Sequence, residues 1–515
     1  MKSSDSEHLF GLSDPGHSQY HSTSRDHCSS RKKETRKKIR GVEFCVHIKL
    51  GPGQDLVPGG SSVMELSPLP QFACHFSSSP HLVSVSTILT QILAQGFSHM
   101  FTQLQRAIVQ RAARVTAAGA QKQLVRAFAS AADDLASCKK TALYDVHVNS
   151  NGKMVPFCGY ALPVQYADTL SVSHNHCRTK ASLFDVSHMG QVRITGEHRI
   201  ALMEKLCVMD LLGAKPSLAK LSVLTNEKGG VIDDCMITPD EKGINIVLNA
   251  GCKDKDMAHI RKHIEQFNAE HPSSDPVRLD YFEDRSLVAL QGPKAAATLQ
   301  SLLPADFDLT KFAFMSSRPT VIKGIPVVVT RCGYTGEDGF EIGCDNRDAV
   351  ALWDILVNQP DVAPAGLGVR DSLRLEAGLC LYGHELEEDI SPVEAGLSWV
   401  ISPRRKREGG FLGADVILSQ LQHGVSRRLV GLEVKEGAPA RHGAPVLDQD
   451  GNQIGTVTSG GPAPSLNMKK IAMAYVATPH AAVGSQVKVS VRGKQGAAEV
   501  VKLPFVQTNY YRVPK

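Results

Sequence analysis

The chain has 515 residues, of which 42% are hydrophobic and 21% are charged, with a formal net charge of +5. This length and apolar content suffice for a large core in two or three domains, which excludes a single small fold. The net charge includes basic residues of the first 130 positions, so the rest of the chain is closer to neutral and gives no argument for a nucleic-acid partner.

Residues 1–99 are predicted to be a disordered extension. The first 80 residues are rich in Ser, His, Gly and Pro, and the basic run 31–38 has little periodicity around it. A basic run of this kind serves as a nuclear-localisation or nucleic-acid signal in some proteins, but it is more often simply solvated. The apolar segment 82–97 is interrupted by Ser, Thr and Gln and is too short to span a bilayer, so no membrane partner is expected.

Residues 100–128 have the pattern of a mitochondrial presequence. Five basic residues and no acidic residue occur between Met100 and Ala132. On a helix, Phe101, Leu104 and Ile108 gather on one side and Arg106 on the other, which is the amphipathic pattern of import signals. The sequence therefore predicts the mitochondrial matrix as the location, with processing after residue 128.

Residues 129–423 show mixed α and β patterns that we expect to form two α/β domains. The apolar periodicity predicts helices over 197–212, 256–267, 294–303, 345–357 and 367–379. It predicts strands over 221–225, 230–232, 244–248, 287–293, 325–331 and 339–342.

The pattern changes near residue 424. Between 424 and 515, short runs such as 428–433, 453–458, 470–476 and 486–491 are separated by Gly and Pro turns at short spacing. This predicts a C-terminal antiparallel β-barrel or sandwich, and the fold class is therefore α+β.

Two adjacent carboxylates, Asp233 and Asp234, follow a pair of glycines on a predicted hairpin. Because side chains alternate along a strand, only one of the two can point into a pocket, which disfavours a paired acid/base device. Either one carboxylate lies beside a reacting nitrogen, or both belong to an ordinary turn, and the residues alone favour the turn.

The segment 330–341 combines three glycines and three acids in one strand-turn-strand unit. Glu341 would be costly if it faced the core unpaired, and a carboxylate suits a ligand with two adjacent NH groups, such as a 2-amino-4-oxo-pyrimidine ring. Solvation of Glu341 on the strand surface is an equally good interpretation.

Arg370 and Arg374 lie one helical turn apart on the same face of a predicted helix. They form either surface salt bridges with Asp371 and Glu376, which is the commoner outcome, or a grip on a carbonyl or carboxylate. The cluster 174–177 is a poor metal site because adjacent residues point apart. No phosphate-loop, nucleophile-elbow or dinucleotide fingerprint is present.

From about Thr141 onward the chain resembles the aminomethyltransferase, or T-protein, family of the mitochondrial glycine cleavage system. The resemblance is carried by ordered blocks at 143–145, 162–166, 182–189, 229–234, 290–293, 330–341, 370–383, 455–460 and 505–511. It implies a three-domain cloverleaf around a folate site, with a C-terminal β-barrel.

The resemblance also implies a reaction. Ammonia is released from the aminomethyl-lipoyl arm of the H protein, and the one-carbon unit passes to tetrahydrofolate, giving 5,10-methylenetetrahydrofolate and the dihydrolipoyl H protein. Tetrahydrofolate is then a co-substrate, no metal is needed, and the partners are the lipoylated H protein and the other glycine cleavage components.

Residue roles follow by motif. Asp234 is implied to be the catalytic carboxylate near the reacting folate nitrogen. Glu341 is implied to accept from the pterin ring, Arg370 to bind at the same site, and Asn249 and Tyr510 to complete its wall.

Two related classes are less compatible with the sequence. A folate-binding protein of iron-sulfur cluster assembly would carry a Lys-Gly-Cys-Tyr-x-Gly-Gln-Glu block, which is not found here. A folate module fused to a dimethylglycine or sarcosine dehydrogenase needs an upstream flavin domain, which residues 1–140 do not supply.

Overall fold

The computed structural model describes residues 73–74, 83–84 and 135–513. Contacts divide the chain into two compact units, residues 1–116 and 117–515. In the first unit, the described residues form one antiparallel pair, β1 (Ala73–Cys74) with β2 (Val83–Ser84). Apart from this pair, the predicted extension lies outside the described residues, and so does the presequence. In the described parts of the chain, no helix is long and apolar enough to cross a membrane.

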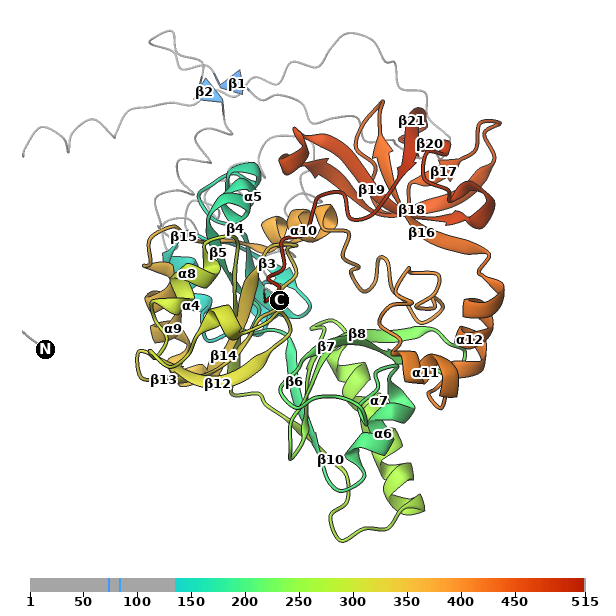
Figure 1. Cartoon of the computed structure of the whole chain (residues 1–515). Helices are drawn as coiled ribbons and strands as arrows, with labels where there is room; N and C mark the ends of the chain where they lie inside the picture. The colour runs from blue at the N-terminus through green and yellow to red at the C-terminus, as the bar shows by residue number, and fades with distance from the viewer. Residues whose placement is uncertain (1–72, 75–82, 85–134, 514–515) are drawn as a thin grey trace, which may run out of the picture. The chain divides into compact units, whose positions relative to one another are not determined.

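A β-hairpin with a helix before it and a helix after it lies near the start of the described part of the second unit (Figure 1). These elements are α4 (Tyr144–Asn149), the antiparallel pair β3 (Lys153–Phe157) and β4 (Tyr160–Gln165), and α5 (Leu170–Thr179).

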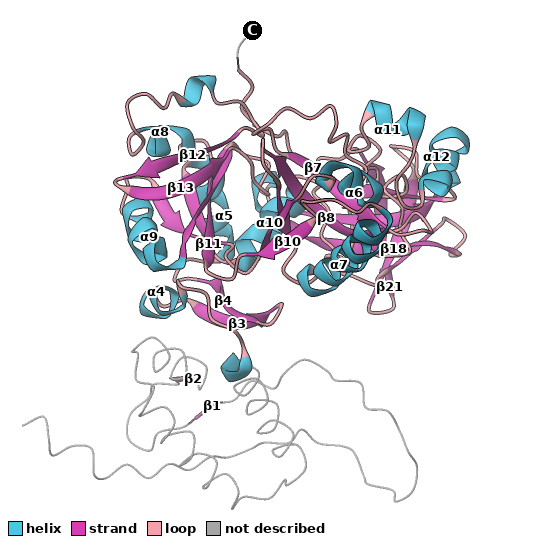
Figure 2. Ribbon diagram, turned by 90° about the horizontal axis from the view of Figure 1, so that it is seen from below, coloured by secondary structure: helices cyan, strands magenta, loops and turns pink. Residues whose placement is uncertain are grey.

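An antiparallel five-stranded sheet follows, in the order β10-β6-β9-β8-β7. Its elements are β6 (Gly190–Thr195), β7 (Lys220–Thr225), β8 (Val231–Pro239), β9 (Ile244–Leu248) and β10 (Arg278–Tyr281), with α6 (Arg199–Leu206) and α7 (Lys253–Glu270). Buried and half-buried residues alternate along β6 and β9, because one face of the sheet packs on α6 and α7 (Figure 2). The opposite face is therefore available for a cavity.

A six-stranded sheet has the order β12-β13-β14-β11-β5-β15. Its strands are β5 (Ala181–Asp185), β11 (Arg285–Gln291), β12 (Ser317–Ile322), β13 (Ile325–Thr330), β14 (Gly339–Asp345) and β15 (Val362–Pro364). One face shares an apolar core with α8 (Ala295–Gln300) and α9 (Ala349–Val357). On the other face, Phe184 and Leu287 pack against Val369 and Leu373 of α10 (Leu367–Glu376).

The C-terminal strands close into a barrel in the order β16-β19-β18-β17-β20-β21. They are β16 (Arg427–Val434), β17 (Pro445–Leu447), β18 (Gln453–Ala463), β19 (Lys469–Ala477), β20 (Gln486–Val491) and β21 (Lys494–Val501). The helices α11 (Pro403–Glu408) and α12 (Ala414–His423) precede the barrel. Short 3₁₀ turns complete the elements: η1 (Leu309–Lys311), η2 (Asn346–Asp348), η3 (Pro464–Leu466) and η4 (Thr478–His480).

The α+β fold class with a C-terminal antiparallel barrel is confirmed. Helix α10 contacts β4 and α5 on one side and the barrel strands β18 and β19 on the other, and it thereby joins the N-terminal region to the barrel (Figure 1). The barrel strands begin at Arg427; the limits 129–423 and 424–515 of the domains stay a prediction.

Two helix predictions extended beyond the observed helix by four or more residues at one end. The helix expected over 197–212 ends at Leu206, because Cys207 forms a β-bridge with Leu224 and the amide of Val208 donates to the Val223 carbonyl. The helix expected over 345–357 begins only at Ala349, after the 3₁₀ turn η2. In both cases a tertiary contact or a turn displaces the helical end that periodicity predicted.

Candidate functional site

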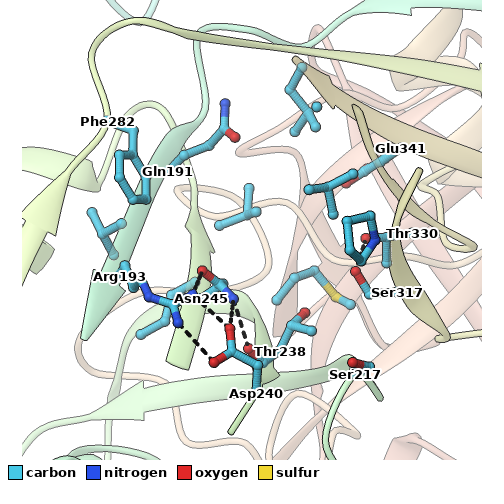
Figure 3. A pocket seen from close by; sticks show the side chains of 18 of the residues that line it. Gln191, Arg193, Ser217, Thr238, Asp240, Asn245, Phe282, Ser317, Thr330 and Glu341 are labelled. Carbon is cyan, nitrogen blue, oxygen red and sulfur yellow. Dashed lines mark hydrogen bonds and ion pairs between the residues drawn. The ribbon is translucent and has the colours of Figure 1, made fainter. Parts of the chain in front are cut away.

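A cavity of about 570 Å³ lies between the open face of the five-stranded sheet and the face of β12, β13 and β14. Figure 3 shows Gln191, Arg193 and Phe282 on one side of it and Ser317, Thr330 and Glu341 on the other. Arg193 is held by Asp240 and Asn245, so this cation is already neutralised within the wall. Of the five predicted site residues, Glu341 lines this cavity directly.

Asp234 lies on the cavity face of β8. Met236 and Thr238, two and four residues further along the strand, line the cavity, and side chains two apart share a face. Asp233, in contrast, is fully buried on the helix side, whereas Asp234 is half-buried. The predicted alternation of the two carboxylates is confirmed.

Asn249 joins the two carboxylates in a way that alternation did not predict. Its side-chain amide donates to Asp233 Oδ1 at 2.9 Å and to Asp234 Oδ1 at 2.8 Å, and its backbone amide donates to Asp233 Oδ2 at 3.0 Å. Asn249 can reach both because it lies beyond the end of β9, where its carbonyl accepts from the amides of Cys252 and Lys253. A single amide therefore fixes the orientation of Asp234.

The pKa of Asp234 is raised to about 7. Burial is the main cause, and the neighbouring negative charge of Asp233 adds to it, while the bond from Asn249 acts in the opposite direction. A carboxyl with a pKa near neutrality is suited to accept or release a proton. A bound ligand can also change its ionisation state.

The charges of Glu341 and Arg370 interact, although Arg370 lines a second, smaller pocket rather than the large cavity. Glu341 is on β14, paired in register with Ala289 and Thr330, and Arg370 is on α10. Burial raises the pKa of Glu341, and the positive charge of Arg370 opposes that rise. The Nη1 atom of Arg370 is buried and has no hydrogen-bond partner among the described residues. A buried guanidinium NH without a partner is a donor that a ligand can use.

The two arginines of α10 have separate roles. Arg374 is buried and bonds Asp371 at 2.9 Å, Glu385 at 2.8 Å and Ser459 of the barrel at 2.7 Å. Arg374 thus forms the expected salt bridge with Asp371, although Arg374 itself is buried and not on the surface. The surface salt-bridge interpretation does not describe Arg370.

Tyr334 is a site residue that sequence reasoning missed. Its ring lies 5.0 Å from the Arg370 guanidinium, and its hydroxyl donates to the Cys380 carbonyl. Burial raises the pKa of Tyr334, and Asp234 is among the nearby acids that raise it further. Tyr334 therefore lies between the Asp234 and Arg370 parts of the site. Its signal in the sequence was its place as the aromatic residue among the glycines of the 330–341 segment.

The other two acids of that segment have structural partners. Asp338 forms a two-point ion pair with buried Arg331, at 2.9 and 2.6 Å. Glu337 accepts from Arg178 at 2.9 Å and from Asn509 of the C-terminal tail at 2.9 Å. These pairs fix the strand-turn-strand unit that presents Glu341.

Tyr510 is not among the residues that line the large cavity. Its ring stacks on Phe314 with centroids 4.4 Å apart, and Tyr511 lies 3.9 Å from the Arg331 guanidinium. The C-terminal tail is thus anchored beside the unit that carries Glu341. The structure brings Asp234 and Asn249 together, and Glu341 and Arg370 together, with Tyr510 placed on the tail.

The side chains of two other clusters form hydrogen bonds or ion pairs with neighbouring residues. His174 bonds Ser372, Glu376 and Ser465, and in the described parts of the chain no group of three or more His, Cys, Asp or Glu residues is arranged to hold a metal ion. The basic run 404–407 lies on α11, where Arg404 pairs with Glu204 and Asp210.

Comparisons with known proteins agree on one family. Residues 143–405 match the GCVT N-terminal domain, and residues 427–507 match the glycine cleavage T-protein C-terminal barrel domain. The chain is 50% identical over 383 residues to the mitochondrial aminomethyltransferase of Dictyostelium discoideum, covering 73% of this chain and 94% of that protein. It is 47% identical over 417 residues to the mitochondrial aminomethyltransferase of Mesembryanthemum crystallinum, covering 80% and 98%.

A solved structure is also similar. The crystal structure of the glycine cleavage system aminomethyltransferase T from Bartonella henselae superposes with a TM-score of 0.67 at 36% identity, covering 73% of this chain and all of that one. The two family models match residues from the start of α4 to just beyond the last barrel strand, with 406–426 between them.

Proposed function

The chain belongs to the glycine cleavage T-protein family and is an aminomethyltransferase, and we propose that the cavity beside Asp234 carries out this reaction with tetrahydrofolate as the acceptor. In this reaction ammonia leaves the aminomethyl-lipoyl arm of the H protein, and 5,10-methylenetetrahydrofolate and the dihydrolipoyl arm are formed. The observation that carries the proposal is a half-buried carboxylate, fixed by Asn249 on the strand face that lines the cavity, with Glu341 in the opposite wall.

The residues of the cavity fit a pterin. Its 2-amino-4-oxo-pyrimidine ring presents adjacent NH groups, which suit the two oxygens of Glu341 in the cavity wall, and a carbonyl, which suits the unpartnered Nη1 of Arg370 outside that wall. Burial of both charges makes these bonds strong, because water competes little for them. Tetrahydrofolate, when bound, supplies the two nitrogens that accept the one-carbon unit.

Asp234 is proposed to act as an ionised carboxylate. Held by Asn249, it needs no reorientation to stabilise positive charge that develops on a nitrogen beside it. Its raised pKa also allows it to take up a proton near neutral pH and to return it. Catalysis by the protein is then mainly positioning and electrostatic stabilisation.

Glu341 and Arg370 are proposed to hold the pterin, and Asn249 to hold Asp234. Tyr510 is proposed to complete the folate site from the C-terminal tail, where it is stacked on Phe314. No metal takes part in this mechanism.

The partners that we propose are the lipoylated H protein and the other glycine cleavage components, without nucleic acid or membrane. The relatives are mitochondrial enzymes, and we propose the matrix for this chain, with residues 100–128 as the presequence. The domain limits 1–99, 129–423 and 424–515 are proposed on the same sequence grounds.

The replacement Asp234→Asn tests the catalytic assignment. We expect most turnover to be lost while tetrahydrofolate still binds, because the amide keeps the shape of the carboxyl and loses its charge. Glu227→Gln, an exposed acid in the turn of the same hairpin, is the matched control and should behave as the wild type. Turnover of Asp234→Asn within a few-fold of the wild type would remove Asp234 from the reaction.

A further inference from the structure

A second pair of acids lies beneath the strand that carries Asp234. Asp256, in the first turn of α7, is fully buried, as is Asp233. Asp233 is the acid whose charge acts most strongly on Asp256. Neither oxygen of Asp256 has a hydrogen-bond partner among the described residues.

A fully buried carboxylate without a donor is costly, and a second buried negative charge nearby adds to the cost. Lys255, a cation whose charge acts on Asp256, donates instead to Tyr382 at 2.6 Å and to Glu388 at 3.1 Å. Two buried acids in this setting are expected to hold one proton between them, as in other buried carboxyl pairs.

The donors around the pair decide which acid keeps the proton. Asp233 accepts from the backbone and side-chain amides of Asn249. Asp256 has no comparable donor, and burial together with Asp233 raises its pKa well above the ordinary value. Asp256 is then the acid and Asp233 the anion. The single negative charge lies near the N-terminus of α7, where the helix dipole favours it.

We propose that Asp256 is a positioning residue, which keeps its proton, donates it to Asp233, and so holds Asp233 as the buried anion that orients Asn249 and Asp234. This inference rests on the proposed role of Asp234. The structure shows the bonds from Asn249 to Asp233 Oδ1 at 2.9 Å and to Asp234 Oδ1 at 2.8 Å, and the bond from Asp256 to Asp233 is the proposed one.

The buried charge of Asp233 has a second consequence. It lies on the other side of β8 from Asp234 and disfavours ionisation of that carboxyl. Removing the charge should therefore make Asp234 a stronger acid. The other titratable groups that face this set are Cys235, Cys252, Lys255, Tyr334 and Cys380.

Three variants of the full chain test the proposal through the pH dependence of kcat. Asp256→Asn still donates to Asp233, and we expect kcat within about threefold of the wild type and an unchanged acidic limb, because the donor is conserved. Asp256→Ala removes the donor, so Asp233 should take up the proton itself. We expect kcat to fall at least about tenfold and the acidic limb to move to lower pH by about one unit. Asp254→Ala, an exposed acid in the same helical turn, is the matched control.

Infrared difference spectroscopy between wild type and Asp256→Asn gives a readout that does not depend on activity. At pH 8 the wild type should show the carbonyl band of a protonated carboxylic acid, and Asp256→Asn should lose it. The proposal is overturned if the wild type lacks this band, if Asp256→Ala keeps the wild-type acidic limb, or if Asp256→Asn is as impaired as Asp256→Ala. An active Asp234→Asn variant with the band present would instead reject the proposed role of Asp234 alone.

Discussion

Replacement of Glu341 and Arg370 tests whether the two residues bind folate as a pair. Each supplies a charged hydrogen-bonding group in a buried setting, and Arg370 has an NH without a partner. A hydrogen bond to a charged group contributes about 1.5–3 kcal/mol. Glu341→Gln and Arg370→Ala should therefore each weaken tetrahydrofolate binding by about 10- to 150-fold.

The double variant should lose less than the sum of the two single losses. Without Arg370, burial raises the pKa of Glu341 unopposed by a cation, so the remaining carboxyl tends to be neutral and accepts more weakly. Equilibrium titration with tetrahydrofolate measures all three affinities, with thermal unfolding as a check on folding. Arg347→Ala, whose side chain is 78% exposed on η2, is the matched control. Affinities of both single variants within twofold of the wild type would refute the pairing.

Three further predictions each concern a single residue. Because ionised Asp234 is the active form and its pKa is about 7, kcat/KM should rise with pH through this value; a profile flat from pH 6 to 8 would contradict the assignment. Asp338→Asn should lower the free energy of unfolding by about 3 kcal/mol in urea titrations, because buried Arg331 loses its partner; a loss below 1 kcal/mol would show the pair to be dispensable. Gly230→Ala should cost about 1–3 kcal/mol, since its Cβ would lie 1.8 Å from a backbone carbonyl oxygen, whereas Gly251→Ala, with ordinary contacts, should be neutral in the same titration.

The hydrophobic periodicity of the sequence predicted many of the helices and strands, because buried residues recur with the period of the helix or strand that contains them. The helix containing Asp256 was placed from helical spacing within three residues of its observed ends, whereas the strand predicted over 230–232 continues to Pro239. Helix 197–212 was too long because its end depends on a bridge to Leu224, which no local pattern contains.

The candidate site likewise contains some residues that a local pattern predicted and others whose roles depend on contacts between distant segments. Alternation predicted that only one of Asp233 and Asp234 can face a pocket, since that depends on one strand only, and the family resemblance selected Asp234. The contacts of Asp256, Tyr334 and Arg370 depend on elements distant in sequence, and a buried acid in the first turn of a helix looks, in sequence, like an ordinary dipole-stabilising residue. Those roles required the tertiary structure.

The most direct test of the central claim is the stoichiometry of the two products. The purified chain is mixed with tetrahydrofolate and with H protein that carries the aminomethyl-lipoyl arm, and ammonia and 5,10-methylenetetrahydrofolate are followed together. Equal amounts of both products, lost together in Asp234→Asn, are the predicted result. Folate binding without either product would contradict the enzymatic assignment and indicate a folate-binding protein of the same fold.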